Sequence, residues 1–232
     1  MATEDDPTAE PALRSALVTG GTGKLGTAIA ARLKRDGWSV LAAGRADGDV
    51  SRPEDARALV ERAAGELGGL GLLVNAASEG FAPRPVAELD ERDWDAAFGA
   101  TAKGSFFVTQ AAAPHLRASS GCVVMVEDVA GYQPWPSFAA HSAAKAAQAM
   151  LTRVLARALA PEVRVCGVAP GPVAVEPGQE ERRAGETLLG RVGSPDDVAA
   201  AVGFLAEADF VTGTTLFVDG GRSLQTGFAP GP

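Results

Sequence analysis

A glycine-rich turn near the start of the chain has the composition of a phosphate-binding loop. Residues 19–26 read TGGTGKLG; they follow an apolar run over 16–19 and precede a helix predicted over 27–35. Glycines let a backbone turn tightly and approach a pyrophosphate, and the exposed N–H groups at a helix start favour its charge. The turn therefore predicts a dinucleotide site, in which Lys24 adds a cation beside the phosphates. The alternative is an ordinary tight turn between a strand and a helix. The cofactor contacts expected here are Thr19, Gly20, Thr22, Gly23, Lys24, Leu25 and Gly26.

An arginine follows the second predicted strand, at the place where a dinucleotide fold reads the adenosine ribose. A carboxylate there would accept hydrogen bonds from the ribose hydroxyls of NAD, whereas an arginine suits the 2′-phosphate of NADP. Arg45 occupies this place, directly after Gly44. The sequence therefore favours NADP(H) over NAD(H). The alternative for Arg45 is an ordinary solvated surface charge.

Two side chains in a predicted alanine-rich helix could support proton transfer. His141 and Lys145 are four residues apart, so both side chains project from one helix face. A histidine can hold or release a proton near neutral pH. The positive charge of Lys145 would disfavour imidazolium, while a nearby carboxylate would favour it, and the sequence does not decide between them. The simpler interpretation of His141 is a partly exposed histidine without a role.

A parallel sheet is the scaffold that would position these groups. Most of the apolar runs are continuous rather than alternating, which is typical of strands covered on both faces. Longer helical patterns separate them, with capping boxes predicted at 51–54 and 194–197 and a helix stop at Gly37. This alternation predicts one doubly wound α/β domain of the Rossmann type. The predicted strands are Ala16–Thr19, Trp38–Ala43, Leu72–Ala76, Cys122–Val126, Val163–Val168 and Thr214–Val218.

Composition and charge narrow the class of protein. The chain has 232 residues, 46% of them hydrophobic, which suits a single large core. A net charge of −8 argues against a nucleic-acid partner, and two cysteines are too few for a disulfide framework or a metal cluster. No apolar run is long enough for a membrane helix, and the acidic start lacks the features of a secretory signal. We expect a cytoplasmic protein acting on a small molecule, with a disordered acidic tail over 1–13, one domain over 14–224 and a C-terminal tail over 225–232.

From Ala16 to Leu224 the chain resembles the short-chain dehydrogenase/reductase family. The supporting motifs occur in the order and spacing of that family, which makes them more specific together than any one alone. They are the turn at 19–26, Asp49-Val50, the LVNAA segment at 73–77, His141 to Lys145, Pro170-Gly171 and the VDGG segment at 218–221.

Finer details resemble one branch of the family, the pteridine reductases and bacterial dihydromonapterin reductases. That branch has a basic residue where most relatives carry the second glycine of the motif, and Lys24 stands there. The AAS segment at 76–78, the FAPRP segment at 81–85, Asp128 in place of the usual serine, and the APEV segment at 160–163 also match the branch. The resemblance implies a planar heterocyclic substrate.

The chain departs from the catalytic pattern of the family, which normally uses Asn, Ser, Tyr and Lys. Thr101 falls on the Asn position, Asp128 on the Ser position and His141 on the Tyr position, and only Lys145 is kept. The segment between the second strand and Asp49 is also shortened to four residues, so the usual helix and much of a strand should be missing. This shortening weakens the transfer of a cofactor preference from the family.

The resemblance implies a role for each remaining site residue. Asp128 with His141 would supply a proton, Thr101 would stand beside them, and Lys145 would hold the ribose of the cofactor. Ser78, Phe81 and Trp135 would contact the substrate, with simple packing as the alternative for the two aromatic residues. Tyr132 is a less favoured replacement for the missing phenol, and Cys122 and Cys166 are expected to be buried. The further cofactor contacts implied are Asp49, Val50, Asn75, Ala76, Ala77, Pro170, Gly171 and Val173.

The sequence thus predicts an NADP(H)-dependent oxidoreductase that reduces a C=O or C=N bond of a small planar substrate, with no metal. The alternative is a cofactor-binding protein that has lost catalysis and acts as a sensor or interaction partner. Two long alanine-rich helices, around 94–114 and 139–160, resemble those that form the dimer seam of the family. We therefore expect a homodimer or homotetramer.

Overall fold

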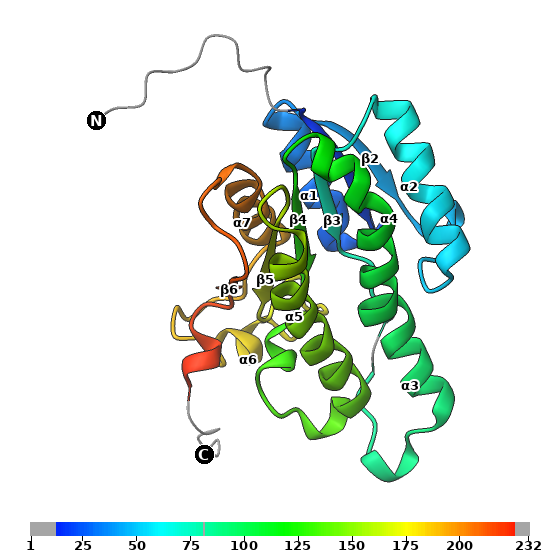
Figure 1. Cartoon of the computed structure of the whole chain (residues 1–232). Coiled ribbons are helices and arrows are strands. Elements are labelled where there is room, and N and C mark those ends of the chain that lie inside the picture. Colours follow the sequence, from blue (N-terminus) through cyan, green and yellow to red (C-terminus); the bar gives the residue numbers. More distant parts are fainter. Residues whose placement is uncertain (1–12, 81, 226–232) are drawn as a thin grey trace.

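Six parallel strands form the centre of the molecule, and helices cover both faces of the sheet (Figure 1). The computed structural model describes residues 13–80 and 82–225. The strand order is β2-β1-β3-β4-β5-β6, so the chain runs outward from β1 in both directions. Ligands of such sheets bind at the carboxyl ends of the strands where the order reverses, here beside β1. The strands are β1 (Ser15–Thr19), β2 (Ser39–Ala43), β3 (Leu72–Asn75), β4 (Cys122–Val126), β5 (Arg164–Pro170) and β6 (Thr215–Val218).

The continuous apolar runs form strands because both faces of the sheet are buried. Leu17, Val123 and Val165 face a cluster shared with α2, α4 and α5, while Val18 and Val124 face a cluster shared with α1 and α7. The predicted sheet is confirmed, and the strand ends differ from the expected ones by one or two residues. The helices are α1 (Lys24–Arg35), α2 (Pro53–Leu67), α3 (Glu91–Phe98), α4 (Gly104–Ala118), α5 (Ala139–Leu159), α6 (Glu180–Ala184) and α7 (Pro195–Glu207).

A single turn of π-helix, η3 (Gly99–Lys103), joins α3 to α4 without a break in the right-handed backbone. The prediction of one long helix around 94–114 is therefore close to the observed arrangement. Single π-turns inside a helix are rare and occur frequently at functional sites. Thr101 lies in the middle of this turn.

The two predicted capping boxes have different outcomes. At the start of α7, the Ser194 hydroxyl accepts a hydrogen bond from the Asp197 N–H (3.2 Å), and the Asp197 carboxylate accepts one from the Ser194 N–H (2.7 Å), as predicted. At α2 the prediction is wrong, because the helix begins at Pro53 and no side chain caps it. The N–H of Ser51 instead donates to Asp49 (2.9 Å), which places Ser51 in a turn before the helix.

The connection between β2 and α2 is as short as expected. It contains one 3₁₀ turn, η1 (Arg45–Asp47), and this turn leads directly to Asp49 beside the cofactor end of the sheet. Helix α1 begins at Lys24, three residues earlier than predicted, because Gly23 already serves as its N-cap. Within the described residues, no helix combines the length and apolar character needed to cross a membrane.

Candidate functional site

An open cleft of about 240 Å³ lies at the carboxyl ends of β1, β2 and β3. At its floor Gly20 has φ +64°, and a Cβ there would lie 2.5 Å from the Ala76 carbonyl oxygen, so only glycine fits. No side chain caps the start of α1, so its first N–H groups can serve an anion. These features fit a dinucleotide. The predicted residues that line the cleft are Thr19, Gly20, Thr22, Gly23, Arg45, Asp49, Val50, Ala76, Ala77 and Ser78.

Both cations predicted to meet the phosphates are held by carboxylates. Arg45 Nη2 lies 2.5 Å from Glu79 Oε2, and Lys24 Nζ lies 3.4 Å from Glu176 Oε1. All four side chains are substantially exposed, and exposed ion pairs contribute little free energy. Either cation can therefore change its partner when a phosphate binds.

Several predicted cofactor residues lie outside the lining of this cleft. Leu25 and Gly26 are in the first turn of α1, and the Asn75 amide donates to Thr109 Oγ1 (3.0 Å) on α4. Pro170 ends β5, and Gly171 packs against Asp219. Val173 pairs with Gly193 in an isolated bridge and lines a different cavity. Their contacts with a cofactor stay predictions.

Asp128 and His141 are in contact, although thirteen residues separate them. Asp128 follows β4, and its Oδ1 accepts a hydrogen bond from the Ala130 N–H (2.8 Å), which fixes the carboxylate. His141 lies in the first turn of α5, and its Nε2 is 3.2 Å from Asp128 Oδ2. The imidazole is 6% exposed and the carboxylate 20% exposed. A carboxylate and an imidazole at this distance can share one proton, and the pair is open enough to pass that proton on.

A second cavity, of about 230 Å³, has His141 and Thr101 in its wall. The buried hydroxyl of Thr101 lies 3.4 Å from that of Ser78, which itself borders the cofactor cleft. The π-helical turn and the segment after β3 thus bring these two residues together. Ser78 thus lines the cofactor cleft, while Thr101 and His141 line the second cavity.

Lys145 is buried beneath the histidine. Its Nζ donates to the Val126 carbonyl oxygen (2.8 Å) and to Gln148 Oε1 (3.0 Å). Burial lowers the pKa of Lys145 to about 8, against the opposing effect of the Asp128 and Glu127 carboxylates. Because these contacts hold the ammonium inside the protein, its predicted contact with a ribose stays a prediction.

Comparison with known proteins identifies the family. Residues 43–223 match the family model described as enoyl-(acyl carrier protein) reductase. The chain is 36% identical to 4-formylbenzenesulfonate dehydrogenase of Comamonas testosteroni, over 90% of this chain and 97% of that protein. It is 35% identical to 3beta-hydroxysteroid dehydrogenase 1 of Eggerthella lenta, over 93% of this chain and 95% of that protein. The chain belongs to the short-chain dehydrogenase/reductase family.

Solved structures agree with this assignment. A short-chain dehydrogenase/reductase from Brucella melitensis superimposes with a TM-score of 0.81 at 29% identity, covering 90% of this chain and 96% of that one. A 7 alpha-hydroxysteroid dehydrogenase in complex with NADH and 7-oxo glycochenodeoxycholic acid gives a TM-score of 0.80 at 25% identity, covering 90% and 93%. The chain is an oxidoreductase of this family, and the family and fold imply a nicotinamide cofactor.

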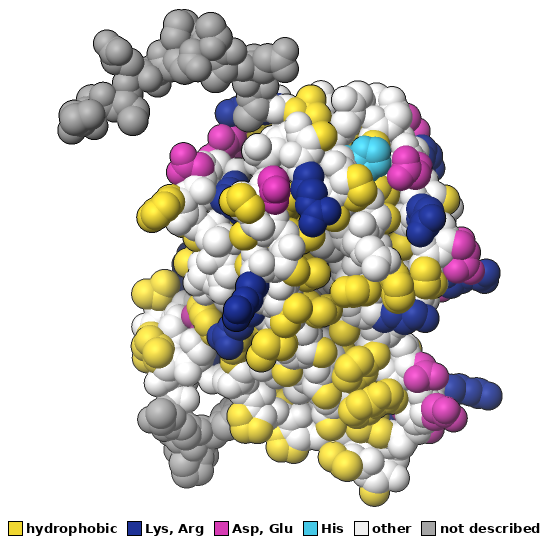
Figure 2. All heavy atoms as spheres, viewed as in Figure 1, with side chains coloured by type: hydrophobic (Ala, Val, Ile, Leu, Met, Phe, Trp, Pro, Cys, Tyr) yellow, Lys and Arg dark blue, Asp and Glu magenta, His cyan; other side chains and the backbone are white. Residues whose placement is uncertain are grey.

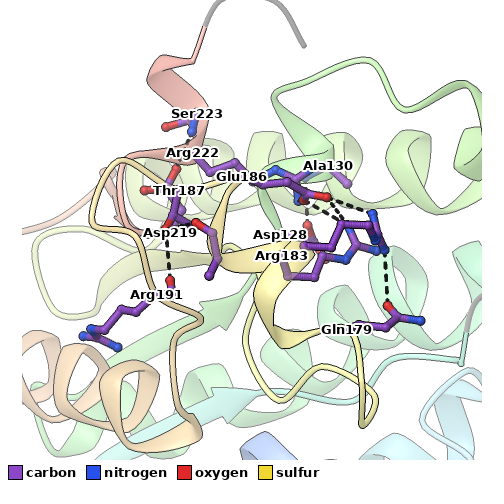
Figure 3. A network of polar contacts seen from close by, with 12 residues as sticks. Asp128, Ala130, Gln179, Arg183, Glu186, Thr187, Arg191, Asp219, Arg222 and Ser223 are labelled. Carbon is purple, nitrogen blue, oxygen red and sulfur yellow. Dashed lines mark hydrogen bonds and ion pairs between the residues drawn. The ribbon is translucent and has the colours of Figure 1, made fainter. Parts of the chain in front are cut away.

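This short-chain dehydrogenase/reductase also contains an ion cluster near Asp128 that the sequence does not reveal (Figure 3). Glu186 follows α6 and lies 3.0 Å from Arg183 and 3.2 Å from Arg222, a nearly buried residue after β6 (Figure 3). The Arg222 guanidinium also covers the ring of Trp135 at 4.5 Å from its centroid. Trp135, predicted to contact substrate, is thus packed against an arginine. The cluster fixes the segment between β5 and α7 beside Asp128.

Three further predictions concern single residues. Phe81, expected to cover a substrate ring, lies outside the described residues. Cys122 and Cys166 are buried, as expected. Tyr132 is not simply exposed: its hydroxyl donates to Glu127 (2.5 Å) and lies 3.0 Å from the Thr215 hydroxyl, and burial together with the Glu127 carboxylate raises its pKa. It is therefore poorly suited to replace the missing phenol. No group of three or more potential metal-binding side chains occurs within residues 13–80 and 82–225.

Glu127, which is buried directly before Asp128, was not predicted as a site residue. Its carboxylate accepts hydrogen bonds from side chains on three other segments of the chain. The available signal was a charged residue directly after an apolar strand, next to a predicted site residue.

Proposed function

We propose that the protein is an NADP(H)-dependent reductase of a C=O or C=N bond in a small planar substrate. The observation that carries this proposal is the contact between Asp128 and His141 (3.2 Å), because His141 lines the second cavity and Thr101 of that cavity contacts Ser78 of the cofactor cleft. A reductase needs a proton donor beside the atom that gains negative charge, and this pair can supply it. Arg45 on the rim of the cofactor cleft supports the choice of NADP(H).

The residues of the cofactor cleft have defined tasks in this proposal. The glycine turn and the start of α1 bind the pyrophosphate, and Arg45 binds the 2′-phosphate after leaving Glu79. Asp49 and Val50 border the adenine. When bound, the cofactor supplies the hydride. The short β2–α2 connection leaves the adenine side of the cleft open, so specificity there depends on few residues.

The proton comes from the pair of Asp128 and His141. Asp128 Oδ1 is fixed by the Ala130 N–H, so Oδ2 is the oxygen that shares a proton with His141 Nε2. As negative charge develops on the substrate oxygen or nitrogen, the protonated pair transfers its proton to that atom. Lys145 adds positive charge below the histidine and thereby stabilises negative charge in the site.

The finer parts of the proposal concern the substrate and the assembly. We infer a flat heterocycle of the pteridine type from the Asp128 substitution and the AAS segment at 76–78, with Ser78 and Trp135 near the ring. His141 of the catalytic pair lies at the start of α5, whose outer face carries exposed apolar side chains. Together with Trp94 on α3, this face supports a two-fold assembly through α3 and α5.

Turnover measurements with two cofactors test the proposed reaction. Purified protein is incubated with NADPH or NADH and a panel of dihydropterins, aromatic aldehydes and ketones from pH 5 to pH 8. We expect oxidation of NADPH with at least one planar substrate. The absence of turnover across the panel, in protein that binds NADPH, would refute the proposed activity.

That result would favour the second candidate, a cofactor-binding protein without catalysis. It is favoured by the prediction that a histidine replaces the phenol of the family, and by the contacts of the Lys145 ammonium with Val126 and Gln148. His141→Tyr distinguishes the candidates, because it restores the family residue beside Lys145. If the site has lost its donor, this change creates activity where none existed. If His141 is a working donor, it changes the pH profile of an activity already present.

A further inference from the structure

Glu127 is a buried carboxylate that no step of the proposed reaction uses. Its side chain lies on the α5 face of the sheet, and the residue is 2% exposed. Thr152 on α5 donates a hydrogen bond to Oε1 (2.6 Å), and Thr215 on β6 donates to Oε2 (3.1 Å). Tyr132, in the loop after Asp128, also donates to Oε2 (2.5 Å). One carboxylate therefore joins a helix, a strand and the loop of the catalytic pair.

The neighbouring strand is shaped to hold this group. Gly167 on β5 lies opposite the carboxylate, and a Cβ at that position would be 2.1 Å from Glu127 Oε1 and 2.8 Å from Thr215 Oγ1. Only a glycine leaves space for the carboxylate between the sheet and α5. Glycine weakens a strand interior, so its presence here is explained by the close approach of Glu127.

The surroundings of Glu127 suit its ionised form. An ionised carboxylate only accepts hydrogen bonds, and the three hydroxyls supply three donors. Burial raises the pKa of Glu127, while the hydroxyl donors and the Lys145 ammonium oppose that change. Lys145 is in turn faced by Asp128 and Glu127, with His141 one turn earlier on the same helix. The positive charge of Arg153 opposes the rise in the pKa of Tyr132.

We propose that Glu127 is a positioning residue of the site: its carboxylate ties the Asp128 loop to α5 and β6, and it contacts α5 on the face that carries Lys145, whose Nζ donates to the carbonyl oxygen of the residue before Glu127. Removal of the charge takes away one of the two carboxylates that raise the pKa of Lys145. Removal of the hydrogen bond from Tyr132 frees the loop that carries Asp128. The two effects can be separated, because Tyr132→Phe loosens the loop and leaves the carboxylate in place.

Lysine titration by NMR tests the charge relation without any need for activity. The chain has four lysines, and Lys24, Lys34 and Lys103 are exposed, so a ¹³C-labelled Lys145 is distinguishable by its titration and assigned with Lys145→Met. We expect Glu127→Gln to lower the titration midpoint of Lys145 by about half a pH unit or more. Asp128→Asn serves as a positive control and lowers it as well, while Tyr132→Phe leaves it within about 0.2 unit. An unchanged or raised midpoint in Glu127→Gln overturns the proposal.

A second variant covers the case in which Glu127→Gln does not fold. Glu127→Met with Thr152→Val and Thr215→Val replaces the carboxylate and two of its donors by apolar side chains of similar size, a type of replacement that buried ionic groups often tolerate. This variant is also expected to lower the titration midpoint of Lys145. An unchanged midpoint in this variant overturns the proposal.

Hydrogen exchange of the backbone amides tests whether Glu127 holds the loop over residues 129–133 in place. Residues 129–133 are expected to exchange several-fold faster in both Glu127→Gln and Tyr132→Phe than in the unchanged protein. Exchange in both variants at the rate of the unchanged protein contradicts the positioning role, because the carboxylate and the phenol would then have no effect on the loop.

The consequence for catalysis rests on the proposed function. Glu127→Gln should reduce kcat several-fold with NADPH affinity unchanged within about twofold, and the alkaline limb of activity should move to lower pH together with the Lys145 midpoint. A protein without turnover refutes the proposed function but leaves the NMR result to decide the role of Glu127. Turnover with an unaffected Lys145 refutes only the role of Glu127.

Discussion

Asp128 and His141 are predicted to take the places of the serine and the tyrosine of the family, and their contact predicts that each matters for proton transfer. Replacement of Asp128 by Asn keeps the shape of the side chain but removes the group that shares a proton with His141 Nε2. We expect turnover in Asp128→Asn to fall by about a hundredfold or more, the usual effect of lost general acid catalysis. Steady-state kinetics measure this loss, and fluorescence titration should show unchanged NADPH affinity. Asp209→Asn, an exposed change, is the matched control. Equal turnover in the two variants would exclude Asp128 from the reaction.

The cofactor preference depends on a pair of opposite charges. Arg45 is expected to make NADPH bind more tightly than NADH, and Arg45→Ala should remove most of the difference. Glu79 now holds Arg45 at 2.5 Å and would also repel a 2′-phosphate, so Glu79→Gln should strengthen NADPH binding by several-fold and leave NADH nearly unchanged. Fluorescence titration of both cofactors measures these effects, with Arg52→Ala as a control. Equal affinities of the unchanged protein for NADPH and NADH would contradict the preference.

At the scale of elements, the sequence predicts the strands, caps and turns, because these depend on residues that are close together in the chain. The apolar runs give the six strands, Ser194 caps α7, and the glycine turn lies at the cofactor cleft. Contacts between distant parts of the chain were not predictable from spacing. Arg45 meets Glu79, thirty-four residues away, and the Glu127 carboxylate depends on a glycine in another strand. The cap at Ser51 fails for a related reason, because Asp49 holds its N–H in a turn before the helix.

The segment between β5 and α7 depends on one carboxylate. Glu186 is 13% exposed and faces Arg182, Arg183 and Arg222, so its loss leaves nearly buried Arg222 without its ion-pair partner (Figure 3). Removal of one partner of such a pair is costly. We expect Glu186→Gln to loosen residues 173–193, with several-fold faster trypsin cleavage at Arg182 and Arg183. Glu181→Gln, an exposed neighbour, should leave the cleavage rate unchanged. Equal cleavage in the two variants would show that the cluster does not hold this segment.

At the scale of the whole molecule, the buried ammonium affects stability. Burial lowers the pKa of Lys145 to about 8, while lysine in an unfolded chain titrates near about 10.4. Below pH 8 both states hold the proton, and the full cost of burying the charge is present. Between these values the unfolded chain holds a proton that the native protein has lost, so the free energy of unfolding rises with pH. This contribution amounts to about 2 kcal/mol between pH 8 and pH 10.

Urea unfolding without cofactor, repeated from pH 7 to pH 10, measures this effect by comparison with Lys145→Met. The raised pKa values of Tyr132 and Cys122 act in the opposite direction at high pH, but they do so in both proteins. The difference in stability between the two proteins should therefore change with pH by the Lys145 contribution. Lys103→Met, which removes an exposed lysine, should follow the unchanged protein. Parallel curves for the unchanged protein and Lys145→Met would contradict a lowered pKa.

The face formed by α3 and α5 predicts how two copies associate. Figure 2 shows hydrophobic side chains gathered where Figure 1 places these helices, and Trp94, Met150 and Val154 are about half exposed there. Because α5 is rich in alanine, two copies of the face can approach closely about a two-fold axis. Sedimentation at micromolar concentration should therefore give a homodimer or homotetramer. Met150→Glu with Val154→Glu places charges in the seam and should yield smaller species, whereas Phe210→Glu, away from these helices, should not. A 23.6 kDa monomer in the unchanged protein would rule out this assembly. The start of α5, where His141 contacts Asp128, would then be ordered without a second copy of the chain.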